Sequence, residues 1–323
     1  MPLYPLVFEP IFKERVWGGR ALERLYRKAL PPDVPIGESW EVADRPGDES
    51  VIANGPHAGR TLRWLMKTNG ADLLGAARPA ADGRFPLLCK ILDAREKLSL
   101  QVHPPARVAH LGDPKTEMWF IAAAEPGAEL FVGLRRGITR DGFETAVVDK
   151  RCADCFHRIA VQPGDVMFLP SGRVHAIGAG LVIFEIQQNS DTTFRVYDWD
   201  RVGLDGKPRE LHVAASLESI DFADVEPALV DNSPASDGAF RRRALVRDPL
   251  FDVDAIEASD TGEMATEART LQVLAVTDGA VNVEGGGVRA ELKAGEFAVL
   301  PAAMTDGRIG AGAGAHFLLV TAG

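Results

Sequence analysis

The segment Leu98-Ser-Leu-Gln-Val-His103 does most to decide the fold of this chain. Its apolar and polar residues alternate with a period of two, which predicts a half-buried β-strand. The two leucines and the valine face one side of this strand, whereas Ser99, Gln101 and His103 face the other. We therefore expect a hydroxyl, an amide oxygen and an imidazole on a single face, close enough to share one ligand.

Two residues further along the chain complement this face. Glu117 follows His103 by fourteen residues, and His175 ends the segment Pro170-Ser-Gly-Arg-Val-His175. Oxygen and nitrogen donors of these types suit a divalent metal ion. We therefore predict that Gln101, His103, Glu117 and His175 are metal ligands inside a small β-barrel.

The composition narrows the class of protein. Hydrophobic residues make up 46% of the 323 residues and charged residues 25%, which is ordinary for a soluble globular protein. The formal net charge of −10 argues against a nucleic-acid partner, and the basic run Arg241-Arg-Arg243 is too short to alter this. No membrane span and no signal peptide are evident. We expect a cytoplasmic protein, with a monomer favoured.

The cysteines give little functional signal. Three cysteines are too few for a disulfide framework, and Cys152 and Cys155 form a lone Cys-x-x-Cys pair without a second pair. No thioredoxin-like strand–helix context surrounds them. We therefore expect reduced cysteines without a zinc or redox role.

Short predicted strands dominate the chain from Phe85 onwards, which indicates double-sheet jelly-roll barrels. In the last third, Asp278-Gly279 lies between the strand-like segments Leu271–Thr277 and Ala280–Glu284, and this pattern predicts a hairpin. Gly285-Gly-Gly287 makes the next turn. The few helices are expected at Ala21–Leu30, Thr61–Lys67, Thr139–Val148 and His212–Ile220.

The two halves of the chain share one pattern. Gly164-Asp-Val-Met-Phe-Leu-Pro170 matches Gly295-Glu-Phe-Ala-Val-Leu-Pro301 in spacing and character, with an offset of 131 residues. The first copy has His175 five residues after its proline, whereas the second has Asp306 at that place. The match suggests a duplication in which the second barrel has lost its metal.

The pattern Gly164-x5-Pro170-x-Gly172-x2-His175 fits the second sequence motif of the cupin barrels, in which a Pro-x-Gly turn delivers the histidine to the barrel interior. A linker-like stretch, Val225–Asp237, follows the first copy. We predict a mainly β fold with two cupin-like jelly-roll β-barrels and a few short helices. Residues 1–230 would form a metal-binding catalytic domain with small helical elements, and residues 240–323 a degenerate cupin-like β domain without metal.

Two further charged residues call for an explanation. Glu185 is the one carboxylate in the strongly apolar segment Leu181-Val-Ile-Phe-Glu-Ile-Gln-Gln188, and burying an unpaired carboxylate costs several kcal/mol. It is either a general acid or base, or the partner of a buried arginine. Arg195 follows this strand and is either an inward active-site residue or a surface partner of Asp191 or Asp198.

Together these residues resemble the type I mannose-6-phosphate isomerases in their short bacterial form. The resemblance covers most of the chain, but the large helical insertion of the longer members is absent. The matching segments are Val16-Trp-Gly-Gly19, Gly37-Glu-Ser-Trp-Glu41, Leu98-Ser-Leu-Gln-Val-His-Pro104, Lys115-Thr-Glu-Met-Trp119, the turn before His175, and Ser190-Asp to Arg195.

The resemblance implies a zinc-dependent aldose–ketose isomerase with one Zn²⁺ per chain and a sugar phosphate as its substrate. It implies that Gln101, His103, Glu117 and His175 are the zinc ligands and that Arg195 is catalytic. Glu185 falls at the position of a proposed acid/base carboxylate, and Ser99 and Lys115 fall at positions associated with the substrate phosphate.

The implied reaction moves a proton between C1 and C2 through a cis-enediol. Glu185 is the first candidate for the base, and an ionised water on the metal is the alternative. Two other functions remain open at this point. One is a metal-dependent cupin of another class, such as an oxygenase, although glutamine in place of the first histidine suits a non-redox metal better. The other is a non-catalytic cupin that binds a sugar phosphate.

Overall fold

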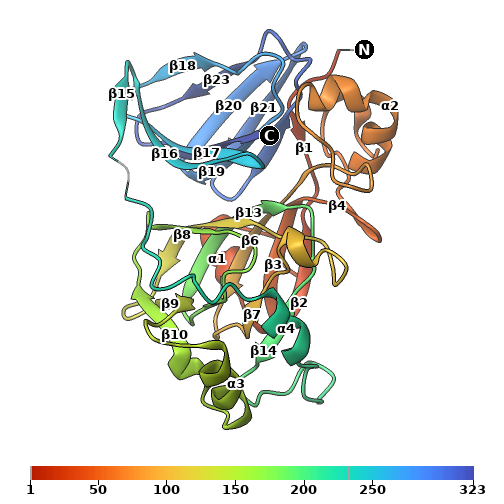
Figure 1. The fold of residues 1–323 in the computed structure, drawn as a ribbon. Coiled ribbons are helices and arrows are strands. Elements are labelled where there is room, and N and C mark those ends of the chain that lie inside the picture. Colours follow the sequence, from red (N-terminus) through yellow and green to blue (C-terminus); the bar gives the residue numbers. More distant parts are fainter. Residues whose placement is uncertain (1, 232) are drawn as a thin grey trace.

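The computed structural model describes residues 2–231 and 233–323. Antiparallel strands dominate it, and its helices are short (Figure 1). The prediction of a mainly β, cupin-like fold is therefore confirmed. The helices are α1 (Ala21–Tyr26), α2 (Leu62–Leu74), α3 (Arg140–Val148) and α4 (Val213–Ser219), with 3-10 turns η1 (Gly55–His57), η2 (Ala106–Val108) and η3 (Cys152–Cys155).

Two sheets enclose the first barrel. The six-stranded sheet has the order β11 (Val166–Leu169), β8 (Glu117–Ala124), β13 (Leu181–Gln188), β6 (Leu87–Ala94), β3 (Ile36–Val42) and β2 (Ile11–Gly19). The five-stranded sheet has the order β10 (Phe156–Ala160), β9 (Glu129–Leu134), β12 (His175–Ile177), β7 (Leu100–Val102) and β14 (Phe194–Tyr197). A small ribbon pairs β4 (Asp44–Arg45) with β5 (Asp48–Glu49).

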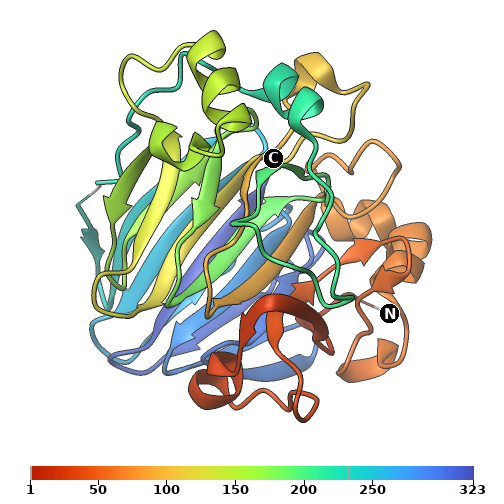
Figure 2. The ribbon, with the colours of Figure 1, turned by 90° about the horizontal axis from the view of Figure 1, so that it is seen from below.

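Two more sheets form the half that Figures 1 and 2 show mostly in blue. The seven-stranded sheet has the order β1 (Leu6–Val7), β22 (Phe297–Leu300), β19 (Gln272–Asp278), β24 (His316–Ala322), β17 (Phe251–Ala258), β16 (Phe240–Asp248) and β15 (Ala235–Asp237). The four-stranded sheet has the order β18 (Gly262–Ala265), β23 (Arg308–Ala311), β20 (Ala280–Gly285) and β21 (Val288–Lys293).

The outer faces of the six- and seven-stranded sheets pack against each other. Phe184 on β13 stacks on Phe297 on β22 with ring centroids 5.5 Å apart, and Ile91 and Val320 belong to the same buried cluster. Both faces of β6 and β13 are therefore covered, and every residue of β6 is buried. This explains why these strands read as continuous apolar runs rather than as alternating ones.

The two halves repeat one strand order. Strands β11-β8-β13-β6 and β10-β9-β12-β7 of the first half have the same succession as β22-β19-β24-β17 and β21-β20-β23-β18 of the second. The matched motifs fall on equivalent strands, since β11 and β22 begin 131 residues apart. This agreement supports the proposed duplication, and the division at residues 230 and 240 stays a prediction.

The predicted hairpin at Asp278-Gly279 is wrong. β19 pairs with β22 and β24, whereas β20 pairs with β21 and β23, so the chain crosses here from one sheet to the other. A local Asp-Gly turn permits a reversal but does not decide which strands pair, and the jelly-roll order decides it here. The next turn is a true hairpin, with positive φ at Gly286 and Gly287. The end of the predicted linker is also wrong, because Ala235–Asp237 forms β15.

The helices form where they were predicted, but α1 ends at Tyr26 rather than at Leu30. The side-chain oxygens of Thr61 and Thr139 accept hydrogen bonds from the backbone N–H groups of Trp64 and Gly142 and so cap α2 and α3. α2 extends beyond the predicted end at Lys67, across a kink at Asn69. No helix of the described residues is long and apolar enough to cross a bilayer.

Candidate functional site

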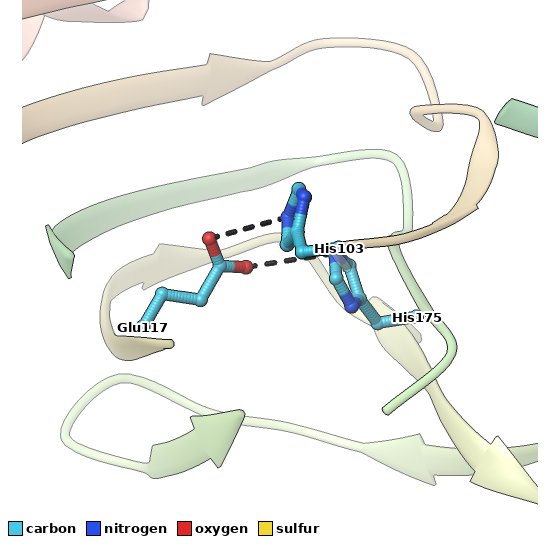
Figure 3. A group of neighbouring side chains, drawn as sticks. All are labelled: His103, Glu117 and His175. Atoms are coloured by element: carbon cyan, nitrogen blue, oxygen red, sulfur yellow. Dashed lines mark ion pairs between the residues drawn. The ribbon is translucent and has the colours of Figure 1, made fainter. Parts of the chain in front are cut away.

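One group of side chains in the first barrel combines two imidazoles and a carboxylate. His103 follows β7 and His175 begins β12 in the five-stranded sheet, whereas Glu117 begins β8 in the opposite sheet. All three come from strand ends, and the carboxylate of Glu117 points toward both imidazoles (Figure 3). Within residues 2–231 and 233–323 this is the one group of its kind that could hold a metal ion.

The three side chains are close together and buried. The Nε2 atoms of His103 and His175 lie 3.5 Å from Oε2 and Oε1 of Glu117, respectively. One ligand atom from each residue lies within 4.8 Å of the others. The side chains of Glu117 and His175 are 1% exposed, and that of His103 is 2% exposed. A single cation between them could therefore contact all three.

The hydrogen bonds of the two imidazoles fix which nitrogen faces the centre. Nδ1 of His103 lies 2.8 Å from the carbonyl oxygen of Thr192, and Nδ1 of His175 lies 3.0 Å from that of Arg173. A carbonyl only accepts, so each Nδ1 carries a hydrogen, and Nε2 is the nitrogen that faces the centre. Burial also lowers the pKa of His175 to about 3, which keeps its ring neutral.

The carboxylate is ionised. Burial alone would raise the pKa of Glu117, but its surroundings, chiefly the Lys115 ammonium, hold the pKa well below its usual range. Oε1 of Glu117 is buried without a hydrogen-bond donor. Two imidazole nitrogens and a carboxylate with an unsatisfied oxygen form a donor set that fits a divalent cation.

Gln101 lies beside this centre. It pairs in register with His175 on β12 and Arg195 on β14, so the three residues form one row across the sheet. Its Nε2 lies 3.3 Å from Nε2 of His175, and its Oε1 accepts a hydrogen bond of 3.2 Å from the Ser99 hydroxyl. A half-turn of the amide would place the oxygen toward the histidine, and its role as a fourth ligand stays a prediction.

A cavity of about 540 Å³ adjoins the centre and runs between the two sheets. This volume lies in the usual range for small-molecule sites. All of the residues that were predicted from the sequence to act on the substrate line it. They are Ser99, Lys115, Glu185 and Arg195, together with Gln101 and His175 of the centre.

Glu185 points into this cavity from the centre of β13. Its Oε2 accepts a hydrogen bond of 3.0 Å from Nε1 of Trp119, and its Oε1 lies 3.3 Å from Nζ of Lys90 and 3.7 Å from Nζ of Lys115. The expected alternative was a salt bridge with a buried arginine, but the partners are two lysines. The ammonium groups compensate the buried negative charge.

The sequence predictions missed Lys90 and its partner Glu38. Nζ of Lys90 lies 3.8 Å from Oε2 of Glu38, whose Oε1 accepts from Arg15. Burial would raise the pKa of Glu38, but Lys90 and Arg15 lower it to about 2. A signal was present, because Lys90 is a lone ammonium in the apolar run Leu87–Leu92, just as Glu185 is a lone carboxylate in its own strand.

Lys115 and Arg195 occupy different environments. Nζ of Lys115 is buried, 2.5 Å from Oε2 of Glu117 and 3.3 Å from Nε2 of His103. Arg195 lies on the opposite sheet and donates from Nη1 to the carbonyl oxygen of Glu210, while its Nε is buried without a partner. The structure does not bring Arg195 into contact with Glu185. Asp198, which was one expected partner of Arg195, pairs instead with two other arginines.

The chain is similar to known proteins over nearly its full length. Residues 6–133 match the family model described as phosphomannose isomerase type I, catalytic domain. The mannose-6-phosphate isomerase ManA of Bacillus subtilis is 40% identical over 229 residues, which are 70% of each chain. A mannose-6-phosphate isomerase of Streptococcus mutans is 33% identical over 300 residues, which are 92% of each chain.

Solved structures show the same fold. The crystal structure of the mannose 6-phosphate isomerase from Bacillus subtilis superposes with a TM-score of 0.89 and 31% sequence identity, covering 98% of this chain and 99% of that one. The apo form of the Salmonella typhimurium enzyme superposes with a TM-score of 0.74. At 18% identity, this second likeness supports the fold alone.

Proposed function

The chain belongs to the type I phosphomannose isomerase family, and on this premise we propose that it interconverts mannose 6-phosphate and fructose 6-phosphate with one zinc ion per chain. The observation that carries the proposal is the group of His103, Glu117 and His175 beside a cavity of small-molecule size, which His175 lines. Gln101 would complete a set of four ligands, in which the nitrogen and oxygen donors suit zinc.

The reaction needs a proton acceptor that reaches C1 and C2 of the sugar and a positive charge near the enediolate oxygen. When bound, the zinc ion would polarise the carbonyl and hydroxyl oxygens of the substrate. Glu185 would take the proton from C2 and return it to C1 by way of a cis-enediol, while the hydroxyl proton passes from O2 to O1. Its position inside the cavity supports this role, as does the N–H of Trp119, which fixes one carboxylate oxygen.

The decisive test of the activity is a coupled assay of purified protein with mannose 6-phosphate, read out as fructose 6-phosphate. Glucose 6-phosphate, which differs only in the configuration at C2, serves as the comparison substrate. We expect turnover of the mannose phosphate to exceed that of the glucose phosphate. Equal turnover of both, or none of either by the zinc-loaded protein, would contradict the proposal.

Arg195 is proposed to stabilise the developing negative charge, because it is always protonated and lines the cavity. Arg195→Ala should lower kcat by roughly a hundredfold and change KM far less, since that charge develops mostly in the transition state. Steady-state kinetics with mannose 6-phosphate would check this split. A variant with normal kcat and a raised KM would make Arg195 a substrate clamp.

Ser99 and Lys115 are proposed to hold the substrate phosphate. Both line the cavity, and Lys115 stands where the cavity meets the ligand group. Since a charge-assisted hydrogen bond contributes about 1.5–3 kcal/mol, Lys115→Met should lower kcat/KM for mannose 6-phosphate by roughly tenfold to a hundredfold. Turnover of unphosphorylated mannose should barely change.

The exposed Lys67 on α2 offers the control, because Lys67→Met removes an ammonium that does not line the cavity. It should leave both rates as they are. Equal losses on the phosphorylated and the free sugar in Lys115→Met would argue against a phosphate contact. They would assign Lys115 to the support of Glu117 instead.

A further inference from the structure

The second barrel also contains a cavity, of about 470 Å³. It opens between strands of the seven-stranded sheet and β18, and its wall combines charged, amide and hydroxyl groups with three apolar side chains. Its lining includes Arg242, Arg247, Asp254, Met264, Gln272, Leu319 and Thr321. No feature of the proposed isomerase reaction accounts for it.

The strand register places this cavity where the first barrel has its active site. Glu117 on β8 pairs with Leu169 at the end of β11, and Gln272 on β19 pairs with Leu300 at the end of β22. Because these strands are equivalent in the two halves, Gln272 stands at the position of Glu117. A metal-ligand carboxylate in the first barrel therefore corresponds to a neutral amide in the second.

The next positions of the register show a reversal of charge. Glu185 on β13 pairs with Lys90 on β6, and at the equivalent place Leu319 on β24 pairs with Asp254 on β17. An aspartate thus takes the place of Lys90, and a leucine takes that of the proposed base. The second cavity has neither the carboxylate for proton transfer nor the charged ligand for a metal ion.

The residue that pairs with this charge also carries the opposite charge in the second barrel. Arg242 on β16 stands where Glu38 stands on β3, and its Nη1 lies 3.4 Å from Oδ2 of Asp254. Arg247 binds the other oxygen of the same carboxylate. An ion pair is thus kept in the wall of both barrels with opposite polarity, and it orients Asp254 as a hydrogen-bond acceptor.

Gln272 adds an unpaired donor to this wall. Gln272 is 2% exposed as a whole residue. Its side-chain Oε1 accepts a hydrogen bond of 2.9 Å from the backbone N–H of Glu267. Since only the oxygen can accept, the amide orientation is fixed. Its NH₂ group donates to no partner within residues 2–231 and 233–323. Because Gln272 lines the cavity, this NH₂ group is left to donate to a ligand or to water there.

We propose that the second barrel binds a neutral monosaccharide in this cavity, as a site separate from the active site. Sugar hydroxyls both donate and accept, and they match an amide donor, a threonine hydroxyl and a carboxylate held by two arginines. The apolar C–H face of a pyranose suits Leu319 and Met264. Two arginines face three carboxylates in the lining, so a phosphate group gains no net attraction here.

The test is a binding measurement on the full-length protein. Ligand-observed NMR with D-mannose should report binding to the wild type, with a Kd on the order of millimolar for so small a ligand. Gln272→Met keeps the length of the side chain but removes the donor, and it should weaken binding by roughly fivefold. The exposed Gln162 is the control, and Gln162→Met should bind mannose as the wild type does.

Three controls separate this site from the active site. Binding should persist in His103→Ala, and Gln272→Met should keep the wild-type kcat/KM with mannose 6-phosphate. If Gln272→Met does not fold, Thr321→Val removes a neighbouring hydroxyl and should weaken binding in the same way. No mannose binding to the wild type, binding that Gln272→Met and Thr321→Val leave unchanged, or binding that is lost in His103→Ala would overturn the proposal.

Discussion

His103→Ala and His175→Ala should each yield a folded protein that holds less than its share of zinc and turns over mannose 6-phosphate on the order of a hundredfold more slowly or worse. Each variant removes one of the two imidazole Nε2 atoms that face the centre. The contact of each Nδ1 with a backbone carbonyl oxygen fixes the orientation of the ring. An incomplete ligand set binds zinc weakly. The remaining fold buries a large apolar core without help from the metal, so circular dichroism should be unchanged.

A histidine outside the site provides the control for these variants. His110 is exposed and pairs with Glu218 at the surface, so His110→Ala should keep the zinc content and the turnover of the wild type. Metal analysis by mass spectrometry and the coupled assay are the two measurements. Full zinc stoichiometry in both His103→Ala and His175→Ala would show that these residues do not hold the ion.

Glu185→Gln should lower the rate at which the C2 hydrogen exchanges with solvent by roughly a hundredfold or more. The substitution keeps the shape of the side chain but removes the proton acceptor. Proton NMR of mannose 6-phosphate in D₂O would follow the exchange directly. Exchange near the wild-type rate would show that another group takes the proton.

This substitution also disturbs a buried ion-pair network, and the chain offers a matched control for that effect. Glu41 on β3 is buried and paired with Lys28 at 2.6 Å, outside the cavity lining. Glu41→Gln therefore removes a buried carboxylate of the same kind and should lower the stability while leaving the C2 exchange intact. A similar loss of exchange in Glu41→Gln would assign the effect of Glu185→Gln to the fold.

Local sequence patterns predicted the strands and the helix caps well, because these depend on neighbouring residues. Thr139 caps α3 as its side chain suggested, and Leu181–Gln188 is β13 with the predicted bounds. The alternation around Gln101 correctly indicated a face shared by Ser99, Gln101 and His103. Strand pairing was harder, because a tight turn such as Asp278-Gly279 is compatible both with a hairpin and with a crossing between sheets.

The candidate site could be assembled only partly from the sequence, for a similar reason. The spacing and the family resemblance together singled out Glu117 and His175, and the structure brings both to His103. The partners of Glu185 depend on which strands lie beside β13. Lys90 becomes its neighbour only through the pairing of β13 with β6. Contacts of this kind depend on which distant strands pair and in which register, and no local sequence pattern predicts that.

The central claim is that the group of His103, Glu117 and His175 holds one metal ion on which isomerisation depends. The most direct test removes metal from the wild-type protein with a chelator and then adds zinc back in steps, with the coupled assay as the readout. We expect turnover to vanish after chelation and to rise linearly until one zinc ion per chain has been added. Turnover that stays at the wild-type level with less than about one metal ion per ten chains would contradict the claim.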